Sequence, residues 1–156
     1  MKTKFMTLFL LTPFLLACNK NTKYDGPKMN IERDTSGQLT ESTPEEMKVV
    51  VIDNQIDSVF FIGDEACSAC GTAKTRLNSW VKEKQGKIYY IPLTTIDENN
   101  IQIVYDVTGG EEGYYSWEKT KTVPAIFFFK QGTAVYRDDG TNVIKYLNTY
   151  VDIQSE

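Results

Sequence analysis

The chain has 156 residues, of which 41% are hydrophobic, a formal net charge of −4 at pH 7 and no histidine. This length suits one ordinary domain with a short tail, and the hydrophobic fraction is sufficient for a packed core. The acidic balance argues against a nucleic-acid-binding protein, because such proteins normally present a basic face to the phosphates. We therefore expect one globular domain that binds no nucleic acid.

The beginning of the chain has the organisation of a secretion signal. Lys2 and Lys4 form a short positive region, and the apolar run 5–16 is shorter than a membrane-spanning helix needs. This run ends in the letters LLAC, which resemble the lipobox of bacterial lipoproteins, where a cysteine receives a diacylglycerol and becomes the mature N-terminus. The resemblance implies that residues 1–17 are removed and that Cys18 carries a lipid anchor. An ordinary secretion signal with an incidental cysteine is the alternative.

Residues 18–42 are polar and nearly free of apolar periodicity, which predicts a flexible tether. The alternative is a short strand around Met29–Ile31 that packs on the domain. The ordered domain is then expected over residues 43–156. Its first helix, over about 44–54, is indicated by a capping Thr43 followed by a proline and two acids. A run of β-branched residues within this segment is also compatible with a strand.

Strand and helix patterns alternate through the rest of the domain. Apolar β-formers predict a strand over 58–63, and apolar residues at helical spacing from Cys70 to Val81 predict a helix that ends near Gly86. The remaining expected elements are a strand over 87–93, a helix over 97–107 capped by Asp97, a hairpin over 122–137 with its turn at Gln131-Gly132, and a final helix with Val143, Ile144, Leu147, Tyr150 and Val151 on one face. This order predicts an α/β fold.

Two cysteines lie three positions apart at the predicted junction of a strand and a helix, in the stretch GDEACSACGTAK over 63–74. Cys67 would project from the first helical turn, where unpaired backbone N–H groups and the helix dipole favour a thiolate. Cys70, one turn further on the same face, could reach back to break a mixed disulfide. We predict that Cys67 is the nucleophile and that Cys70 is the resolving residue and the more buried of the two.

Other uses of the cysteine pair lack the ligands they need. A structural zinc site requires four Cys or His ligands, and the chain has no His and no further Cys once Cys18 carries the lipid. A c-type haem requires a His after the second cysteine, where Gly71 stands. Copper delivery generally adds a His as well. We expect no metal and no cofactor, and an inert structural disulfide stays open as the alternative.

The order of the elements, the C-x-x-C pair and the run Thr122-Val123-Pro124 together resemble the thioredoxin-like superfamily, over about residues 43–153. The resemblance implies a thioredoxin-like fold with a central mixed β-sheet flanked by helices. It also implies that Pro124 is cis and, with Val123, forms the shelf on which a substrate disulfide docks. With its lipobox, the chain resembles membrane-tethered thiol-disulfide oxidoreductases of Gram-positive bacteria and is similar to thioredoxin-like accessory proteins found with bacteriocin export.

The chain departs from that family pattern near the cysteines. Phe61 stands where cytoplasmic thioredoxins have a buried Asp that assists proton transfer at the resolving thiol, and Ala66 replaces the usual Trp. Asp64 and Glu65 would oppose a thiolate at Cys67. These differences leave the direction of electron flow open.

The loop over 108–122 is longer than a minimal thioredoxin needs before the proline. Its glycines permit mobility, and Tyr114, Tyr115 and Trp117 offer aromatic area of the kind that anchors partners. The loop could form a substrate lip beside Cys67. Alternatively, its aromatic residues pack on the preceding helix.

These observations predict a monomeric thiol-disulfide oxidoreductase on the extracytoplasmic face of the cell membrane, acting on thiols or disulfides of exported proteins. Oxidation is favoured, because the position of Phe61 lacks a carboxylate and because the secretory route leads to a compartment where disulfides persist. The alternative direction is the reduction of substrate disulfides, with electrons supplied by a membrane redox partner. A non-catalytic binding module that assists secretion of a partner is the alternative function.

Overall fold

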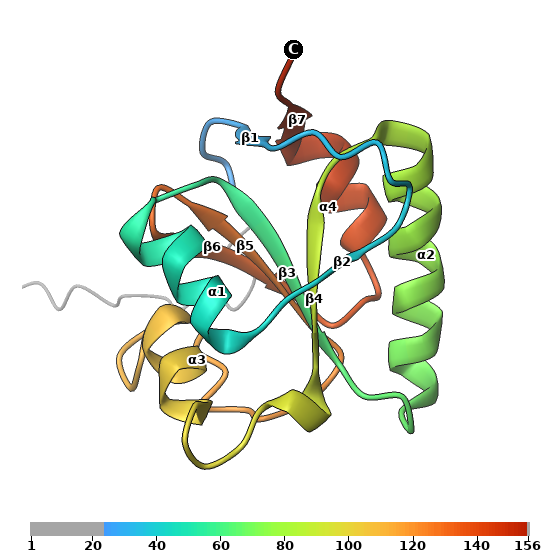
Figure 1. Ribbon diagram of the computed structural model, residues 1–156. Coiled ribbons are helices and arrows are strands. Elements are labelled where there is room, and N and C mark those ends of the chain that lie inside the picture. Colours follow the sequence, from blue (N-terminus) through green and yellow to red (C-terminus); the bar gives the residue numbers. More distant parts are fainter. Residues whose placement is uncertain (1–23, 156) are drawn as a thin grey trace, which may run out of the picture.

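The computed structural model describes residues 24–155, so the predicted signal and the lipidation site at Cys18 lie outside the described residues. Its centre is a five-stranded sheet in the order β2-β4-β3-β5-β6 (Figure 1). The strands of this sheet are β2 (Thr40–Glu41), β4 (Ile88–Pro92), β3 (Ser58–Gly63), β5 (Ala125–Lys130) and β6 (Thr133–Asp138). The first three are mutually parallel, and β5 and β6 add antiparallel pairings. The expected mixed α/β sheet is therefore confirmed.

Helices cover both faces of the sheet (Figure 1). They are α1 (Pro44–Lys48), which continues as the π-helical turn η1 (Val49–Asp53), α2 (Ser68–Lys84), the 3₁₀ turn η2 (Leu93–Thr95), α3 (Ile101–Val107) and α4 (Val143–Tyr150). One core layer joins α1 and α3 to the sheet, and the other joins α2 and α4 to it. In the part of the chain that the structure describes, no helix has the length and apolar character needed to cross a membrane.

The central strand β3 is buried along its whole length and serves both core layers. Because successive side chains of a strand point to opposite faces, Phe60 and Ile62 pack in the layer of α1 and α3, whereas Val59 and Phe61 pack in the layer of α2 and α4. Cys70 lies in this second layer. The strand thus carries Phe61 to the same side of the sheet as the cysteine pair.

The segment before α1 differs from the flexible tether that we expected. Strand β1 (Met29–Ile31) pairs in parallel with the C-terminal strand β7 (Val151–Ile153), and Met29 and Ile31 are each only 1% exposed. Two apolar residues in alternation are too short a signal to identify a strand, and the partner strand lies at the other end of the chain. The alternative of a strand around Met29 is the correct one, and the packed domain begins well before residue 43.

Two predicted helix starts have different outcomes. Thr43 and Glu46 form the expected capping box at the start of α1, in which each side chain accepts a hydrogen bond from the other residue's backbone N–H. The third helix begins at Ile101, not at Asp97. The Asp97 carboxylate accepts the backbone N–H of Asn99 at 2.8 Å, so Asp97 opens a turn that precedes the helix.

The end of α2 lies one residue before the expected cap. Gln85 adopts the left-handed conformation with φ 60°, and Gly86 follows it. A Cβ on Gly86 would lie 2.8 Å from the Trp80 ring. The glycine is therefore required for close packing and not for the turn itself.

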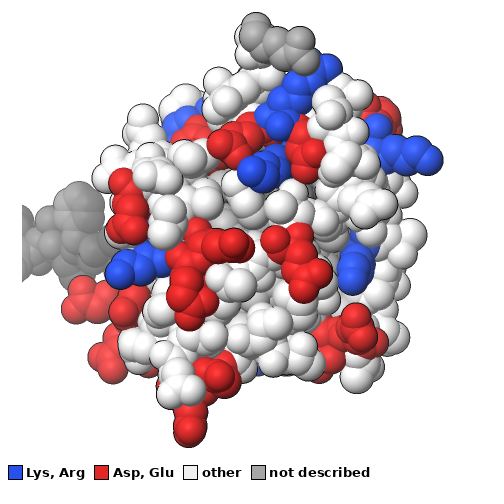
Figure 2. Space-filling model, in the orientation of Figure 1, with Lys and Arg blue, Asp and Glu red and all other residues white. Residues whose placement is uncertain are grey.

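Charged side chains of both signs cover the face seen in Figure 1. Asp and Glu are concentrated over its lower half, and Lys and Arg lie mainly toward its upper end and its sides (Figure 2). This distribution agrees with the modest acidity of the whole chain.

Candidate active site

Cys67 is the N-cap residue of α2, directly after the turn that follows β3. The Asp64 carboxylate accepts the backbone N–H of Ala66 at 3.0 Å, and the backbone N–H of Cys67 donates to the Asp64 carbonyl at 3.2 Å. The backbone N–H of Cys70 donates to the Cys67 sulfur at 3.2 Å. This donor is one of the N–H groups of the first helical turn that have no partner within the helix, and the Cys67 sulfur is its acceptor.

Cys70 lies inside the first turn of α2 and is only 3% exposed, whereas Cys67 is half-buried. Burial, reinforced by the neighbouring Cys67, raises the pKa of the Cys70 thiol to about 11. Both cysteines are free thiols in this structure. The pair therefore has one accessible sulfur with a hydrogen-bond donor and one buried sulfur that holds its proton at neutral pH.

The loop before β5 brings Val123 against Cys67. The Val123–Pro124 peptide bond is cis, as the resemblance implied, and the Val123 carbonyl oxygen lies 3.9 Å from the Cys67 sulfur. Val123 packs against both core layers, and Pro124 is buried. The structure thus brings together Cys67, Cys70, Val123 and Pro124, the four residues that were predicted for the site within the described chain.

Trp117 holds this loop in place. Its indole N–H donates to the Thr122 carbonyl at 3.0 Å, and its backbone N–H donates to the Thr108 hydroxyl at 3.0 Å. The Trp117 ring is 2% exposed and packs against Tyr105 of α3. Of the two expectations for the long loop, packing on the preceding helix is therefore correct for Trp117.

A third segment, the turn between β6 and α4, packs against α2 next to the cysteines. The buried Asp138 carboxylate accepts the backbone N–H groups of Gly140 at 2.7 Å and Asn142 at 3.2 Å, and burial raises the pKa of Asp138. Gly140 has φ +90°, and a Cβ there would lie 3.0 Å from Ala73 and 3.6 Å from Pro124. Sequence reasoning missed this turn, although its letters RDDG over 137–140 are typical of one.

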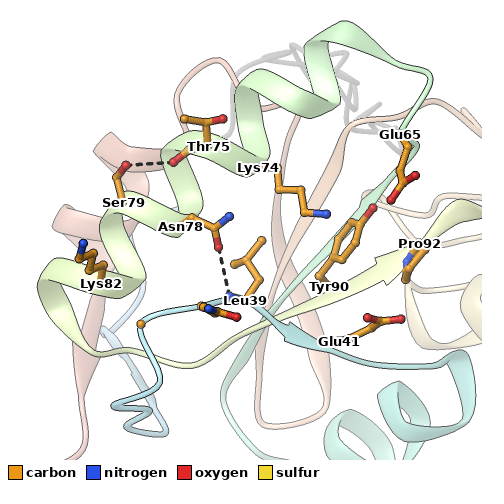
Figure 3. Close-up of a pocket in the computed structure, with 12 residues that line it drawn as sticks. Leu39, Glu41, Glu65, Lys74, Thr75, Asn78, Ser79, Lys82, Tyr90 and Pro92 are labelled. Carbon is orange, nitrogen blue, oxygen red and sulfur yellow. Dashed lines mark hydrogen bonds between the residues drawn. The ribbon is translucent and has the colours of Figure 1, made fainter.

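On the other side of the cysteine pair, Phe61 is fully buried and lies 5.1 Å from the Tyr90 ring of β4. Tyr90 lines a pocket of about 610 Å³ between α2 and the β2–β4 edge (Figure 3). The Lys74 ammonium reaches from α2 to 4.2 Å above the Tyr90 ring, and Glu65 lies beside the hydroxyl (Figure 3). Burial, followed by the nearby charges of Glu65 and Cys70, raises the pKa of Tyr90.

Comparison with known proteins identifies this architecture. No protein-family model matches the chain, and no curated protein matches it by sequence. Solved structures do match: thioredoxin O2 from Arabidopsis thaliana, in the oxidised state, has a TM-score of 0.51 at 16% identity, with 75% of this chain and 98% of that chain covered. The short form of thioredoxin f from spinach chloroplast has a TM-score of 0.52 at 15% identity, covering 74% and 93%.

A third similar structure is of a protein whose description names a thioredoxin fold. Its TM-score is 0.54 at 16% identity, and the match covers 74% of this chain and 96% of that chain. At this identity the likeness concerns the fold. The strand order and the helices on both faces agree with it, and the chain has the thioredoxin fold.

Proposed function

We propose that this protein is a thiol-disulfide oxidoreductase that uses Cys67 and Cys70. The observation that carries the proposal is the geometry of Cys67, whose half-exposed sulfur accepts the Cys70 backbone N–H at 3.2 Å and lies 3.9 Å from the Val123 carbonyl. Such a sulfur is accessible to a substrate and supported as a thiolate. The likeness to thioredoxin-fold structures supports the same chemistry.

In the oxidising direction, the resting form carries a Cys67–Cys70 disulfide. A substrate thiolate attacks the Cys67 sulfur, the Cys67–Cys70 bond breaks, and Cys70 leaves and takes up a proton, because its pKa is raised to about 11. A second substrate thiolate then attacks the substrate sulfur of the mixed disulfide. The substrate gains a disulfide, Cys67 leaves as a thiolate, and two electrons have passed to the cysteine pair.

Two features favour oxidation of the substrate. The N–H donor to Cys67 stabilises the thiolate of the reduced form, and stabilising the reduced form makes a disulfide more oxidising. Phe61 is apolar, so the buried position beside Cys70 supplies no carboxylate. Asp64 and Glu65 oppose the thiolate, but the Asp64 carboxylate is turned toward the Ala66 N–H.

The proposed setting is the extracytoplasmic face of the membrane, with Cys18 lipidated and with exported proteins, for example those of a bacteriocin export system, as substrates. A monomer suffices for this function. Cys18→Ala should release the protein from the membrane fraction into the medium. If the variant stays in the membrane fraction, the lipid anchor is not at Cys18.

Trapping of mixed disulfides tests the proposed chemistry. In a Cys18→Ala background, Cys70→Ser should accumulate mixed disulfides through Cys67, because the resolving thiol is gone. Cys67→Ser should trap almost none, since Cys70 is buried. Equal trapping by the two variants contradicts the division of labour, and no trapping by either favours the non-catalytic binding module.

A further inference from the structure

A second hollow, which we call the tyrosine groove, crosses the edge strand β6 between α4 and the loop over 114–120. Its volume is about 720 Å³. Five tyrosines line it: Tyr114, Tyr115, Tyr136, Tyr146 and Tyr150. Three cations line it as well: Lys119, Arg137 and Lys145. The thiol chemistry proposed above uses none of these side chains.

The tyrosine rings hold one another in place. Tyr136 and Tyr146 are stacked with their centroids 3.8 Å apart, and Tyr115 packs against Tyr136 at 6.1 Å. Tyr114 meets Tyr115 edge-on at 4.9 Å but remains 66% exposed. Rings that are already positioned lose little conformational freedom when a partner binds, and Tyr and Arg are the residues that most often anchor protein partners.

The charges of the groove leave Lys119 and Lys145 available to a partner. Among residues 24–155, no ion pair within 4.0 Å involves Lys119, Arg137 or Lys145. The Asp138 carboxylate is buried and already accepts backbone N–H groups, and only Asp139 offsets part of the charge of Arg137. The accessible charge is therefore mainly positive, in a chain that is acidic overall.

The groove is joined to the candidate active site by direct contacts. Arg137 donates to the Thr122 hydroxyl at 2.9 Å and also hydrogen-bonds the Thr120 hydroxyl. Thr122 precedes Val123, whose carbonyl oxygen lies 3.9 Å from the Cys67 sulfur. A polypeptide whose cysteine reacts with Cys67 would therefore extend past Thr122 onto Arg137 and the tyrosines.

We propose that the tyrosine groove binds the polypeptide segment that flanks the reacting cysteine of a substrate, and that it selects segments with aromatic and acidic residues. The inference rests on the proposed function, since that function supplies the reacting cysteine. Aromatic side chains can pack against Tyr114, which is 66% exposed, and carboxylates complement the exposed Lys119 and Lys145. The groove thus gives the substrate class: unfolded or extended polypeptides that are acidic and aromatic beside a cysteine.

The test uses two short peptides of equal length, one with Tyr, Phe, Asp and Glu beside its central cysteine and one with Gly and Ser. For the exchange measurement, each peptide cysteine is joined to 5-thio-2-nitrobenzoate. The protein, in the Cys18→Ala background, is first reduced with dithiothreitol and desalted, so that Cys67 and Cys70 are thiols. Cys67 attacks the peptide sulfur, the coloured thiolate leaves, and Cys70 then forms the Cys67–Cys70 disulfide and releases the peptide thiol. For the binding measurement, labelled peptides carry Ser in place of cysteine and are followed by fluorescence anisotropy.

The acidic aromatic peptide should react and bind roughly tenfold better than the Gly/Ser peptide, since a few exposed charge pairs and one aromatic contact supply about that factor. The ratio between the two peptides is the readout. Lys119→Gln/Lys145→Gln and, separately, Tyr114→Ala should lower this ratio severalfold. The matched control Lys48→Gln/Lys82→Gln removes two exposed cations outside the groove and should leave the ratio unchanged.

The outcomes separate the two proposals. Equal reaction and equal binding of the two peptides overturn the groove, as does a control pair that lowers the ratio as much as the groove pair. Preferential binding by a protein that, after reduction, fails to react even with 5,5′-dithiobis(2-nitrobenzoate) supports the groove and overturns the redox function. Preference for a sulfated polysaccharide over the acidic aromatic peptide in the anisotropy measurement also overturns the polypeptide assignment.

Discussion

The molecule has two hollows of similar size and different chemistry, one beside Tyr90 and one at the tyrosine groove. The pocket beside Tyr90 has one aromatic ring, and two carboxylates face two ammonium groups across it (Figure 3). Its Lys74 is already engaged with the Tyr90 ring at 4.2 Å. The tyrosine groove has five aromatic rings and three cations without ion pairs in residues 24–155. Arg137 lies over the Phe127 ring at 5.5 Å and hydrogen-bonds Thr122, whereas Lys119 and Lys145 are exposed.

This difference shows how one fold divides two tasks. On the Tyr90 side, Lys74 lies above the ring, and Tyr90 shares a core layer with the buried Cys70. On the side of β6 and α4, the groove presents the exposed side chains of Tyr114, Lys119 and Lys145 to solvent, and its Arg137 contacts the loop that reaches Cys67. In the function proposed above, the first side affects the chemistry of Cys70, and the second selects the substrate.

The largest effect is expected for the pH dependence of substrate release through Cys70. Burial remains when Cys67 is in a mixed disulfide, although the contribution of Cys67 to the raised pKa is lost. The attacking species is the thiolate, so between about pH 7 and pH 9 the release rate should rise close to tenfold per pH unit. Stopped-flow measurement of release from a trapped peptide checks this, with Cys70→Ser as the control. A rate that levels off below about pH 8 would mean that the buried side does not hold the proton.

A smaller effect is expected for Trp117→Phe, which weakens the support of the substrate side. The variant keeps an aromatic ring but loses the N–H that donates to the Thr122 carbonyl at 3.0 Å. The free energy of unfolding should fall by about 1 kcal/mol, the usual contribution of one such bond. Urea denaturation measures it, and Tyr114→Phe, at a residue that is 66% exposed, is the control with little change. An unchanged stability of Trp117→Phe would show that the loop is held in another way.

The smallest effect is expected for Lys74→Gln, on the Tyr90 side. The substitution removes the ammonium above the Tyr90 ring, a contact that contributes about 0.5 kcal/mol to stability. It should leave the preference for the acidic aromatic peptide unchanged, in contrast to Lys119→Gln/Lys145→Gln. If Lys74→Gln lowered that preference equally, the two sides would not have separate tasks.

The sequence predicted the central elements because each has a local signal. The run SVFFIG reads as a buried strand, Thr43 and Glu46 read as a capping box, and Gln131-Gly132 reads as a hairpin turn with both residues at positive φ. Cys67 and Cys70 follow from their spacing at the start of a helix. Each of these patterns involves residues that are close together in the chain, so the local sequence is enough to recognise it.

Features that depend on distant partners could not be predicted in the same way. Strand β1 exists because Met29 and Ile31 pair with the far end of the chain, and nothing near them in the sequence indicates this. The tyrosine groove joins residues from a loop, an edge strand and the last helix. Val123 could be placed at the site only through the resemblance, since its contact with Cys67 spans 56 positions.

The reduction potential of the Cys67–Cys70 pair tests the central claim most directly. The purified protein is equilibrated with glutathione buffers of graded composition, and the fraction of free thiol is measured at each. We predict a reversible two-electron transition at a potential well above that of thioredoxin, which is about −270 mV, because the hydrogen bond from the Cys70 N–H to the Cys67 sulfur stabilises the reduced form. A transition near or below about −270 mV contradicts the oxidising direction, and a pair that does not exchange with glutathione at all contradicts the redox function.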